Sequence, residues 1–561
     1  MATKKEKKQK PLEQVLMESC NKLRSNMSGI NYMYFVMGLV FLKFASLKFE
    51  KRRNELANSE DAFAIDIPSF YAEKNVFYIP KNSRWTFIKN NSKKDKIEVE
   101  VVESGEIVKK EMTLGMLIDN ALDELEKSNK DLKGALPIGM YNKASIPASN
   151  FSSLISEIDK ICEDNEHPMN DLIGNTYQYM LMEFSKNTAS EKGEFYTPAN
   201  IVNLIDTLIE PYSGKLYDPA CGTGGMFVQS YKFVENNNGN INNISVYGQE
   251  SNPDTWKLAR MNLGIRGIPA KLGKINADTF SNDQHKDVKF DYIMANPPFN
   301  LPDWRTENQL VDDPRWAGYG LPPVSNANYA WILHMLSKLS VNGIAGFLLA
   351  NGALGDSERS NLEIRKNLIK KGKIECIIIL PREMFFYPDI SVTLWIMDNN
   401  PCEKIVKSMH GEKKVRDRTN DILLMDLRTY GKKTNLGNVE LSEETVKMVK
   451  EIYENWKSPN WKNLYKNIPE LCQSVTIDEI RNGMTDKKRS EKGISINISD
   501  IGSTWSLIPS KYIEFIDHDL EIDFPKEMTR IQKEMSKLLK EEKASQKQLE
   551  DAFRGIGYDI E

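Results

Sequence analysis

Between residue 215 and about residue 400, short apolar runs alternate with segments that have the residue spacing of helices. Turn residues bound each run, and the intervening segments place apolar residues three or four positions apart. Strands separated by helices do not pair as tight hairpins, so this pattern predicts an α/β fold with a doubly wound, mainly parallel sheet. The expected strands lie within the runs KLYDPACGTGG, ISVYGQE, AKLGKINAD, FDYIMANPPF, GIAGFLLANG, IECIIILP and VTLWIMD.

The glycine-rich turn DPACGTGG follows the first expected strand, at the edge where ligands of such sheets bind. Gly222, Gly224 and Gly225 allow a sharp turn and the close approach of a ligand to the backbone. The helix that follows adds a partial positive charge. The sequence has no GxxxxGK[ST] loop, so it does not predict ATP hydrolysis. A tight strand-to-helix turn without any ligand is the alternative.

Two carboxylates follow the next two expected strands. Glu250, in GQE, lies where an acidic side chain can accept hydrogen bonds from both hydroxyl groups of a ribose. Asp278, in NADTF, can accept a hydrogen bond from an adenine amino group. Each residue alone is more often a surface or capping carboxylate. A glycine turn, a Glu and an Asp at three successive strand ends together indicate a site for adenosine.

A stiff corner, NPPF, follows the apolar run DYIMA. Proline fixes φ and lacks an N–H group, so the carbonyl of Pro297 points in one direction. The side-chain oxygen of Asn296 and this carbonyl are two acceptors, which match the two donors of an exocyclic amino group. Phe299 offers a flat face on which a base can stack. An ordinary proline-rich loop is the less favoured alternative.

The flanking regions have different patterns. Residues 11–170 read mostly as helix, with a β-like, aromatic patch at 83–104. Residues 441–481 look helical and 483–498 look like a loop. In the tail 526–553, apolar residues recur at heptad-like spacing, which fits a solvated helix packed on its own domain or a short coiled-coil arm for a partner. We therefore expect three domains, at 1–170, 171–430 and 431–561.

Composition limits the partners and the compartment. A net charge of −4 is unusual for a protein that grips nucleic acid by itself, although a local basic face or a partner can supply charge. The six cysteines are scattered without a CxxC pair, which argues against disulfides or a zinc site and favours a reducing cytosol. The N-terminus lacks a signal peptide, and the most apolar segment, 32–45, is too short to span a bilayer and fits a buried helix.

The motifs DPACGTGG, GQE, NAD and NPPF, with EFYTP upstream of them, resemble the ordered motifs of amino-group DNA methyltransferases. The flanks are more specific. Residues 21–46, 84–88, 118–137 and 171–181 are similar to the N-terminal helical domain of modification (M) subunits of type I restriction–modification systems. This resemblance covers most of residues 11–430 and implies a Rossmann-like methyltransferase sheet, a helical N-terminal domain and C-terminal helices.

The resemblance also implies roles for individual residues. S-adenosylmethionine would be the methyl donor, with its ribose on Glu250 and its adenine on Asp278. The acceptor would be N6 of an adenine flipped out of duplex DNA, bound by Asn296 and Pro297 and stacked on Phe299 beside Pro298. No metal is required. The remaining cofactor-binding residues would be Glu194, Phe195, Tyr196, Thr197, Pro198, Ala199, Asp218, Cys221, Gly222, Thr223, Gly224 and Gly225.

The resemblance implies partners as well. In such systems a separate specificity (S) subunit reads the DNA, two M subunits join it, and a separate translocase–nuclease subunit cuts. The near-neutral charge and the missing ATP loop agree with this division of work. The expected location is the cytoplasm of a bacterium or archaeon, with no membrane association, and the C-terminal helices are the expected contact with the S subunit. The DNA motif, the preference for unmethylated or half-methylated sites, and the stoichiometry do not follow from the sequence.

Several rival functions differ in one feature each. A 5-cytosine methyltransferase needs a thiol in a Pro-Cys loop; Pro401-Cys402 lies after the last expected strand and lacks a Glu-Asn-Val partner motif. An N4-cytosine enzyme shares the chemistry but more often has Ser or Asp in place of Asn296. A protein-glutamine methyltransferase leaves residues 11–150 and 400–561 unexplained. A binding scaffold with a dead site is disfavoured by the intact motif residues. A buried small side chain is the simpler interpretation of Cys221 within the glycine turn.

Overall fold

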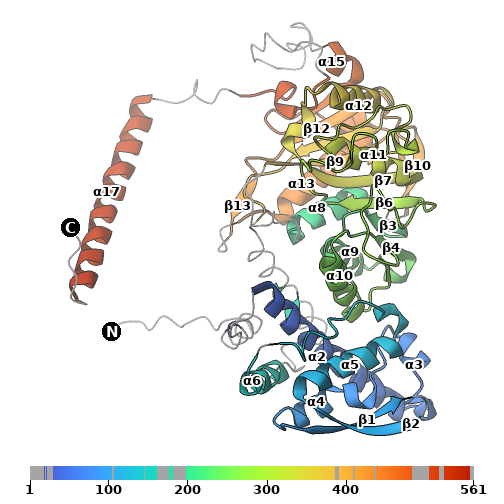
Figure 1. Ribbon diagram of the computed structural model, residues 1–561. Coiled ribbons are helices and arrows are strands. Elements are labelled where there is room, and N and C mark those ends of the chain that lie inside the picture. Colours follow the sequence, from blue (N-terminus) through green and yellow to red (C-terminus); the bar gives the residue numbers. More distant parts are fainter. Residues whose placement is uncertain are drawn as a thin grey trace.

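The computed structural model is shown in Figure 1. It describes Glu18, Asn21 and residues 29–103, 106–144, 146–160, 176–177, 179–180, 197–385, 391–408, 411–434, 438–482, 505–516 and 524–555.

A nine-stranded sheet forms the centre of the larger part of the molecule, in the order β15-β12-β8-β9-β7-β6-β3-β4-β5. All seven predicted runs contain a strand, and the predicted doubly wound, mainly parallel sheet is confirmed. Strands β9 and β15 run antiparallel to their neighbours. The strands are β3 (Gly214–Asp218), β4 (Ile244–Gly248), β5 (Ala270–Lys271), β6 (Phe290–Ala295), β7 (Leu339–Ala350), β8 (Ile374–Ile379), β9 (Val392–Asp398), β12 (Asp421–Asp426) and β15 (Cys472–Thr476).

Helices cover both faces of the sheet. Successive strand residues enter different hydrophobic clusters, as Leu216 and Tyr217 of β3 do, because side chains alternate across a sheet. One cluster takes residues from α8 (Ala199–Ile209), α9 (Gly225–Asn236) and α13 (Glu443–Lys457). The other takes residues from α11 (Asn328–Lys338) and α12 (Arg359–Lys370). The strands are buried on both faces, which explains their nearly continuous apolar runs.

The N-terminal region has its own core, built mainly from α2 (Gly29–Ala57), α5 (Leu114–Ser128) and α6 (Ala148–Asp159). The β-like patch is only half strand. Its first part is the helix α4 (Trp85–Asn91), because Trp85, Ile88 and Asn91 recur on one buried face. The hairpin of β1 (Ile97–Glu103) and β2 (Glu106–Met112) follows. Short α3 (Ser69–Ala72) completes the region.

Helix α10 (Pro253–Ile265) joins the two parts of the molecule, as Figure 1 shows. Leu258, Met261 and Ile265 enter the N-terminal core, whereas Trp256 and Leu263 enter a cluster of the sheet. Within the described residues, the apolar helix α2 is buried and no helix combines the length and hydropathy of a membrane span.

The helical prediction for 441–481 is confirmed for α13 (Glu443–Lys457) and is wrong for residues 472–476. Residues 472–476 form β15, which adds to the sheet edge beside β12 because Cys472 and Val475 enter the core. Two hairpins, β10 (Lys404–Ser408) with β11 (Gly411–Val415) and β13 (Gly431–Lys433) with β14 (Val439–Leu441), were not predicted. Short α14 (Trp461–Leu464) and α15 (Ile477–Asn482) flank β15. The predicted loop 483–498 lies outside the described residues. The predicted domain boundary at 430/431 falls between β12 and β15 of the nine-stranded sheet. The division into three domains stays a prediction.

The predicted C-terminal helix is α17 (Phe524–Gly555). It stands apart from the rest of the molecule in Figure 1, and Met528, Ile531, Met535 and Leu538 are exposed. The helix is therefore not packed on its own domain, which was one of the two interpretations of its pattern.

Candidate active site

The carboxyl ends of β3, β4 and β6 meet at one edge of the sheet, where the strand order reverses. Backbone hydrogen bonds connect the segments that follow β3, β4 and β5. The Gln249 N–H donates to the Asp218 carbonyl at 3.0 Å, and the Cys221 N–H donates to the Gln249 carbonyl at 2.9 Å. The Ala277 N–H donates to the Glu250 carbonyl at 2.9 Å. The glycine turn, Glu250 and the turn with Asp278 therefore form one continuous surface.

The glycine turn has the geometry that only glycine adopts easily. Gly222 and Gly224 have φ values of 53° and 78°. A Cβ atom on Gly224 would lie 3.0 Å from Leu263, so helix α10 packs directly against the turn. Helix α9 begins at Gly225, which places its N-terminus at the site.

Two buried residues fix the start of this turn. Asp218 is buried, its Oδ1 accepts a hydrogen bond from the Ala220 N–H at 2.9 Å, and burial raises its pKa to about 8. Burial also raises the pKa of the Cys221 thiol well above its ordinary value. Cys221 is buried, which agrees with its interpretation as a small buried side chain. Both residues support the turn from inside. Thr223 is buried as well, and its carbonyl accepts a hydrogen bond from Asn262.

Glu250 is held against the glycine turn. Its Oε2 accepts a hydrogen bond from the Gly222 N–H at 3.1 Å, and its Oε1 accepts one from the Asn252 N–H at 2.7 Å. Burial raises the pKa of this carboxyl above its usual range, and the backbone donors oppose the shift. The carboxylate is thus fixed in position, and each of its oxygens keeps acceptor capacity for a further donor.

Asp278 organises the next turn in a similar way. Its Oδ1 accepts hydrogen bonds from the N–H groups of Phe280 and Ser281 and from the Ser281 hydroxyl. Among the described residues, Oδ2 has no hydrogen-bond partner. The neighbouring Thr279 hydroxyl donates to the Pro219 carbonyl at 2.6 Å, which ties this turn to the glycine turn.

Asn296 begins the stiff corner directly after β6. Its amide Nδ2 donates to the Thr197 hydroxyl at 3.1 Å, across 99 residues of sequence. Its Oδ1 is buried and has no partner among the described residues. A buried acceptor without a partner is costly, so such an atom is rare unless a ligand satisfies it.

The rest of the corner is packed. Pro297 is buried, Pro298 is half-buried, and Phe299 is half-buried against the hydrophobic cluster of α8, α9 and α13. The ring of Phe299 lies 6.5 Å from the ring of Phe385, edge to face. Sequence reasoning missed Phe385, although the aromatic pair in PREMFFYP after the strand IECIIILP was a signal.

The upstream motif reaches the site through Thr197. Pro198 and Ala199 follow, at the start of α8. Sequence reasoning assigned Thr197 to the cofactor alone, whereas its hydroxyl contacts Asn296 of the other motif. Glu194, Phe195 and Tyr196 lie outside the described residues.

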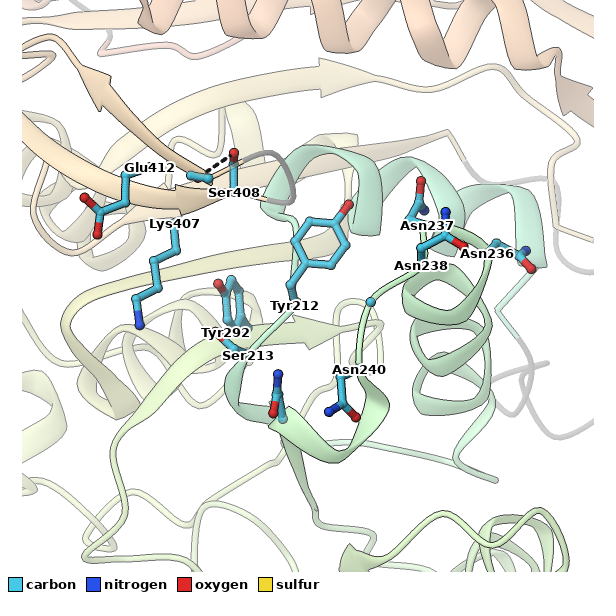
Figure 2. Close-up of a pocket in the computed structure, with 13 residues that line it drawn as sticks. Tyr212, Ser213, Asn236, Asn237, Asn238, Asn240, Tyr292, Lys407, Ser408 and Glu412 are labelled. Carbon is cyan, nitrogen blue, oxygen red and sulfur yellow. Dashed lines mark hydrogen bonds between the residues drawn. The ribbon is translucent and has the colours of Figure 1, made fainter.

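A cavity of about 710 Å³ lies elsewhere, at the edge where the strands begin. Figure 2 shows its lining, which includes Tyr212 and Ser213 before β3, Tyr292 of β6, and Lys407 and Glu412 of the β10–β11 hairpin. It contains none of the predicted site residues. Among the described residues, no group of three or more His, Cys, Asp or Glu side chains could hold a metal ion.

Comparisons with known proteins agree with this geometry. Residues 168–492 match the N-6 DNA Methylase family, and residues 12–158 match the HsdM N-terminal domain. The methylase subunit of the type I restriction enzyme HindI from Haemophilus influenzae is 33% identical, over 86% of this chain and 100% of that protein. The MjaIX methylase subunit from Methanocaldococcus jannaschii is 30% identical, over 97% of this chain and 91% of that protein.

Solved structures show the same fold. The methyltransferase subunit of a type I restriction–modification system from Streptococcus thermophilus superposes with a TM-score of 0.67 at 20% identity. The match covers 90% of this chain and 99% of that one. The modification subunit of a putative type I restriction enzyme from Vibrio vulnificus gives 0.57 at 18% identity, over 86% and 96%.

The family match spans more than half of the chain and includes every strand-end motif described above. The second match covers the separate N-terminal core. Two relatives at 30% identity or more extend over nearly their whole length. The chain therefore belongs to the N-6 DNA methylases, as the modification subunit of a type I restriction–modification system and an adenine-N6-specific DNA methyltransferase.

Proposed function

We propose that this subunit transfers the methyl group of S-adenosylmethionine to N6 of an adenine flipped out of duplex DNA. The carrying observation is the buried Oδ1 of Asn296, which directly follows a central strand and has no partner within the part of the chain that the structure describes. The amide nitrogen of the same side chain is held by Thr197, so the oxygen is left for the substrate.

The residues at the strand ends fit S-adenosylmethionine. The glycine turn lets a ligand approach the backbone, Glu250 has acceptor capacity for ribose hydroxyls, and Oδ2 of Asp278 can accept from an adenine amino group. Thr197 contacts Asn296, and Thr197, Pro198 and Ala199 would contact the methionine end. When bound, the cofactor supplies an electrophilic methyl group.

Asn296 and Pro297 would hold the acceptor amine. Two oxygens that accept the two N–H donors of N6 fix the amine and favour the pyramidal geometry that exposes its lone pair. Phe299 would stack on the base. Because N6 is inaccessible inside the base stack, the adenine must leave the duplex to reach this corner.

The division of work among subunits belongs to the same proposal. We assign DNA recognition to a specificity subunit and cleavage to a restriction subunit, with a second modification subunit in the assembly. Exposed apolar residues on α17 would supply a surface for the specificity subunit. We assign the chain to the cytoplasm of a bacterium or archaeon, because the proposed assembly acts on DNA. We also propose three domains, 1–170, 171–430 and 431–561, of which the last adds the edge strand β15 to the sheet of the second.

The test measures which nucleoside receives a labelled methyl group from S-adenosylmethionine. The chain is incubated, alone and with its candidate specificity subunit, with methyl-labelled S-adenosylmethionine and DNA, and the DNA is digested to nucleosides. We expect label in N6-methyl-2′-deoxyadenosine and its loss in Asn296→Ala. Label in cytosine or in protein contradicts the assigned acceptor. Calorimetry without DNA tests the cofactor separately, since a chain that binds no S-adenosylmethionine lacks the proposed donor site.

A further inference from the structure

The corner NPPF continues into a closed loop, residues 300–327, that precedes α11. Hydrogen bonds join its two ends. The Asp303 N–H donates to the Val324 carbonyl at 3.0 Å, and the Ala327 N–H donates to the Leu301 carbonyl at 3.0 Å. The loop is therefore an ordered unit attached to the corner that holds Asn296.

This loop packs on the turn that carries Asp278. The ring of Phe280 lies 4.6 Å from Trp304 of the loop and 4.3 Å from Trp331 of α11. The ring centroid of Trp304 also lies 5.9 Å from that of Trp316, in the same loop. The turn that carries Asp278, the proposed cofactor half of the site, thus shares an aromatic core with the loop that continues from Asn296, the proposed target half.

Arg315 of the loop forms hydrogen bonds both within the loop and to the turn that carries Asp278. Its guanidinium forms a bidentate pair with Asp313, through Nε at 2.8 Å and Nη2 at 2.7 Å. The same group donates to the carbonyls of Thr279 at 3.3 Å and Phe280 at 2.6 Å. The side chain is 11% exposed, so these charge-assisted bonds are largely shielded from water.

Helix α11 holds the guanidinium from the other side. Nη1 of Arg315 lies 3.2 Å from Nδ1 of His334, and Nε2 of His334 lies 3.3 Å from the Tyr217 hydroxyl. Burial, with Arg315 and Lys338 nearby, lowers the pKa of His334 well below its ordinary value, so the ring is neutral. A guanidinium only donates, so Nδ1 accepts and the ring proton is on Nε2, toward Tyr217. Tyr217 directly precedes Asp218 of the glycine turn.

We infer that Arg315 is a positioning residue that couples the two halves of the site. Through the carbonyls of Thr279 and Phe280 it fixes the turn that presents Asp278 to the cofactor. Through Asp313 it anchors that turn to the loop that continues from the target-binding corner. This inference deepens the proposed function and rests on it.

The matched control is Arg305, a second buried arginine of the same loop. Among the described residues, its guanidinium donates only to carbonyls within the loop, those of Thr306, Glu307, Gln309 and Pro322. A substitution of Arg305 therefore perturbs the loop without removing a direct bond to the Asp278 turn. The comparison separates coupling from general damage to the loop.

The first measurement is cofactor affinity by calorimetry without DNA, on Arg315→Gln, Arg315→Lys and Arg305→Gln. We expect Arg315→Gln to weaken S-adenosylmethionine binding about tenfold, because two charge-assisted bonds to the turn are lost. Arg315→Lys recovers part of this affinity, and Arg305→Gln keeps the wild-type value. Equal affinity in Arg315→Gln and wild type, or an equal loss in Arg305→Gln, overturns the inference.

Steady-state kinetics with the assembled enzyme provide the second readout. Arg315→Gln should raise the KM for S-adenosylmethionine more than it lowers kcat at saturating cofactor, whereas a merely structural loss lowers kcat and leaves KM unchanged. If Arg315→Gln does not fold, Asp313→Asn is used, which frees the guanidinium from its anchor; we expect a KM increase of about threefold. An unchanged KM in that variant contradicts the inference. A wild-type chain that binds no cofactor contradicts the proposed function instead.

Discussion

The two halves of the candidate site differ in how far the protein satisfies its own polar groups. On the cofactor half, Glu250 and Asp278 already accept hydrogen bonds from backbone N–H groups. On the target half, the buried oxygen of Asn296 has no partner among the described residues. The backbone thus fixes the carboxylates of the proposed cofactor half, which keep acceptor capacity for a ligand, whereas the buried acceptor of the proposed target half has no partner among the described residues. Under the proposed function the target half is therefore the half that discriminates, because an unpaired buried acceptor should strongly reject a substrate without an N–H group.

The largest expected effect comes from the target half. Asn296→Ala should lower methyl transfer by at least roughly 100- to 1,000-fold, because the acceptor that positions the amine is lost. S-adenosylmethionine affinity should stay at the wild-type value, since the proposed function assigns this side chain to the target base and not to the donor. Single-turnover transfer and calorimetry give the two numbers. A loss of cofactor affinity would mean that Asn296 also binds the donor, which would contradict the assignment of roles.

Phe299→Ala is the next largest change. Base–aromatic stacking contributes roughly 1–3 kcal/mol, so kcat/KM for DNA should fall about 10- to 100-fold. Phe299→Tyr keeps the flat face and serves as the control. A fluorescent base analogue at the target position reports whether the base still leaves the stack. If the alanine and tyrosine variants transfer equally well, Phe299 is not the stacking platform.

On the cofactor half, Glu250→Gln should weaken S-adenosylmethionine binding about tenfold, because a neutral amide is a poorer acceptor than a carboxylate. DNA binding by the assembled enzyme should not change. Equilibrium binding of each ligand to the same variant provides the measurement, and a loss confined to DNA would place Glu250 on the wrong half.

The same residue predicts a pH dependence. Burial raises the pKa of Glu250, so its carboxyl becomes protonated at a higher pH than a free glutamate as the pH falls. Cofactor affinity should therefore decrease on acidification and approach that of Glu250→Gln, whose own affinity stays flat. A parallel decrease in both proteins would assign the titration to another group.

A substitution of Thr197 should have the smallest effect, and it tests whether this residue of the upstream motif acts on the target half through Asn296. Its hydroxyl accepts the hydrogen bond from Nδ2 of Asn296. Thr197→Val removes this bond at nearly constant volume and should lower kcat a few fold, since the amide loses its fixed orientation. Thr197→Ser retains the hydroxyl and should behave as wild type. Equal activity of both variants would mean that packing alone orients Asn296.

Much of the catalytic edge was predictable because strand ends follow from apolar periodicity. The runs that end at Asp218, Gly248 and Ala295 are strands, and parallel order brings their ends together. The hairpins after residue 400 were not predicted, since their short, lysine-rich strands such as KIVKS are half-buried or exposed and carry a weak apolar signal. Strand β15 was assigned to helix because its core contacts come from distant β12.

The missed site residues share a physical cause. Arg315 and Phe385 act through contacts with residues 35 and 86 positions away, to Phe280 and Phe299 respectively. Neither belongs to a motif of fixed local spacing. The hydrogen bond between Thr197 and Asn296 is of the same kind, since only the folded chain brings the first motif beside the last.

The most direct test of the account is a structure of the assembled enzyme with target DNA and an unreactive S-adenosylmethionine analogue. The decisive quantity is the distance from Oδ1 of Asn296 to N6 of the target adenine. The account predicts a base outside the duplex and a hydrogen-bond distance of about 2.7–3.2 Å. An adenine amine bound by other groups, with Oδ1 of Asn296 still unpaired, would contradict it.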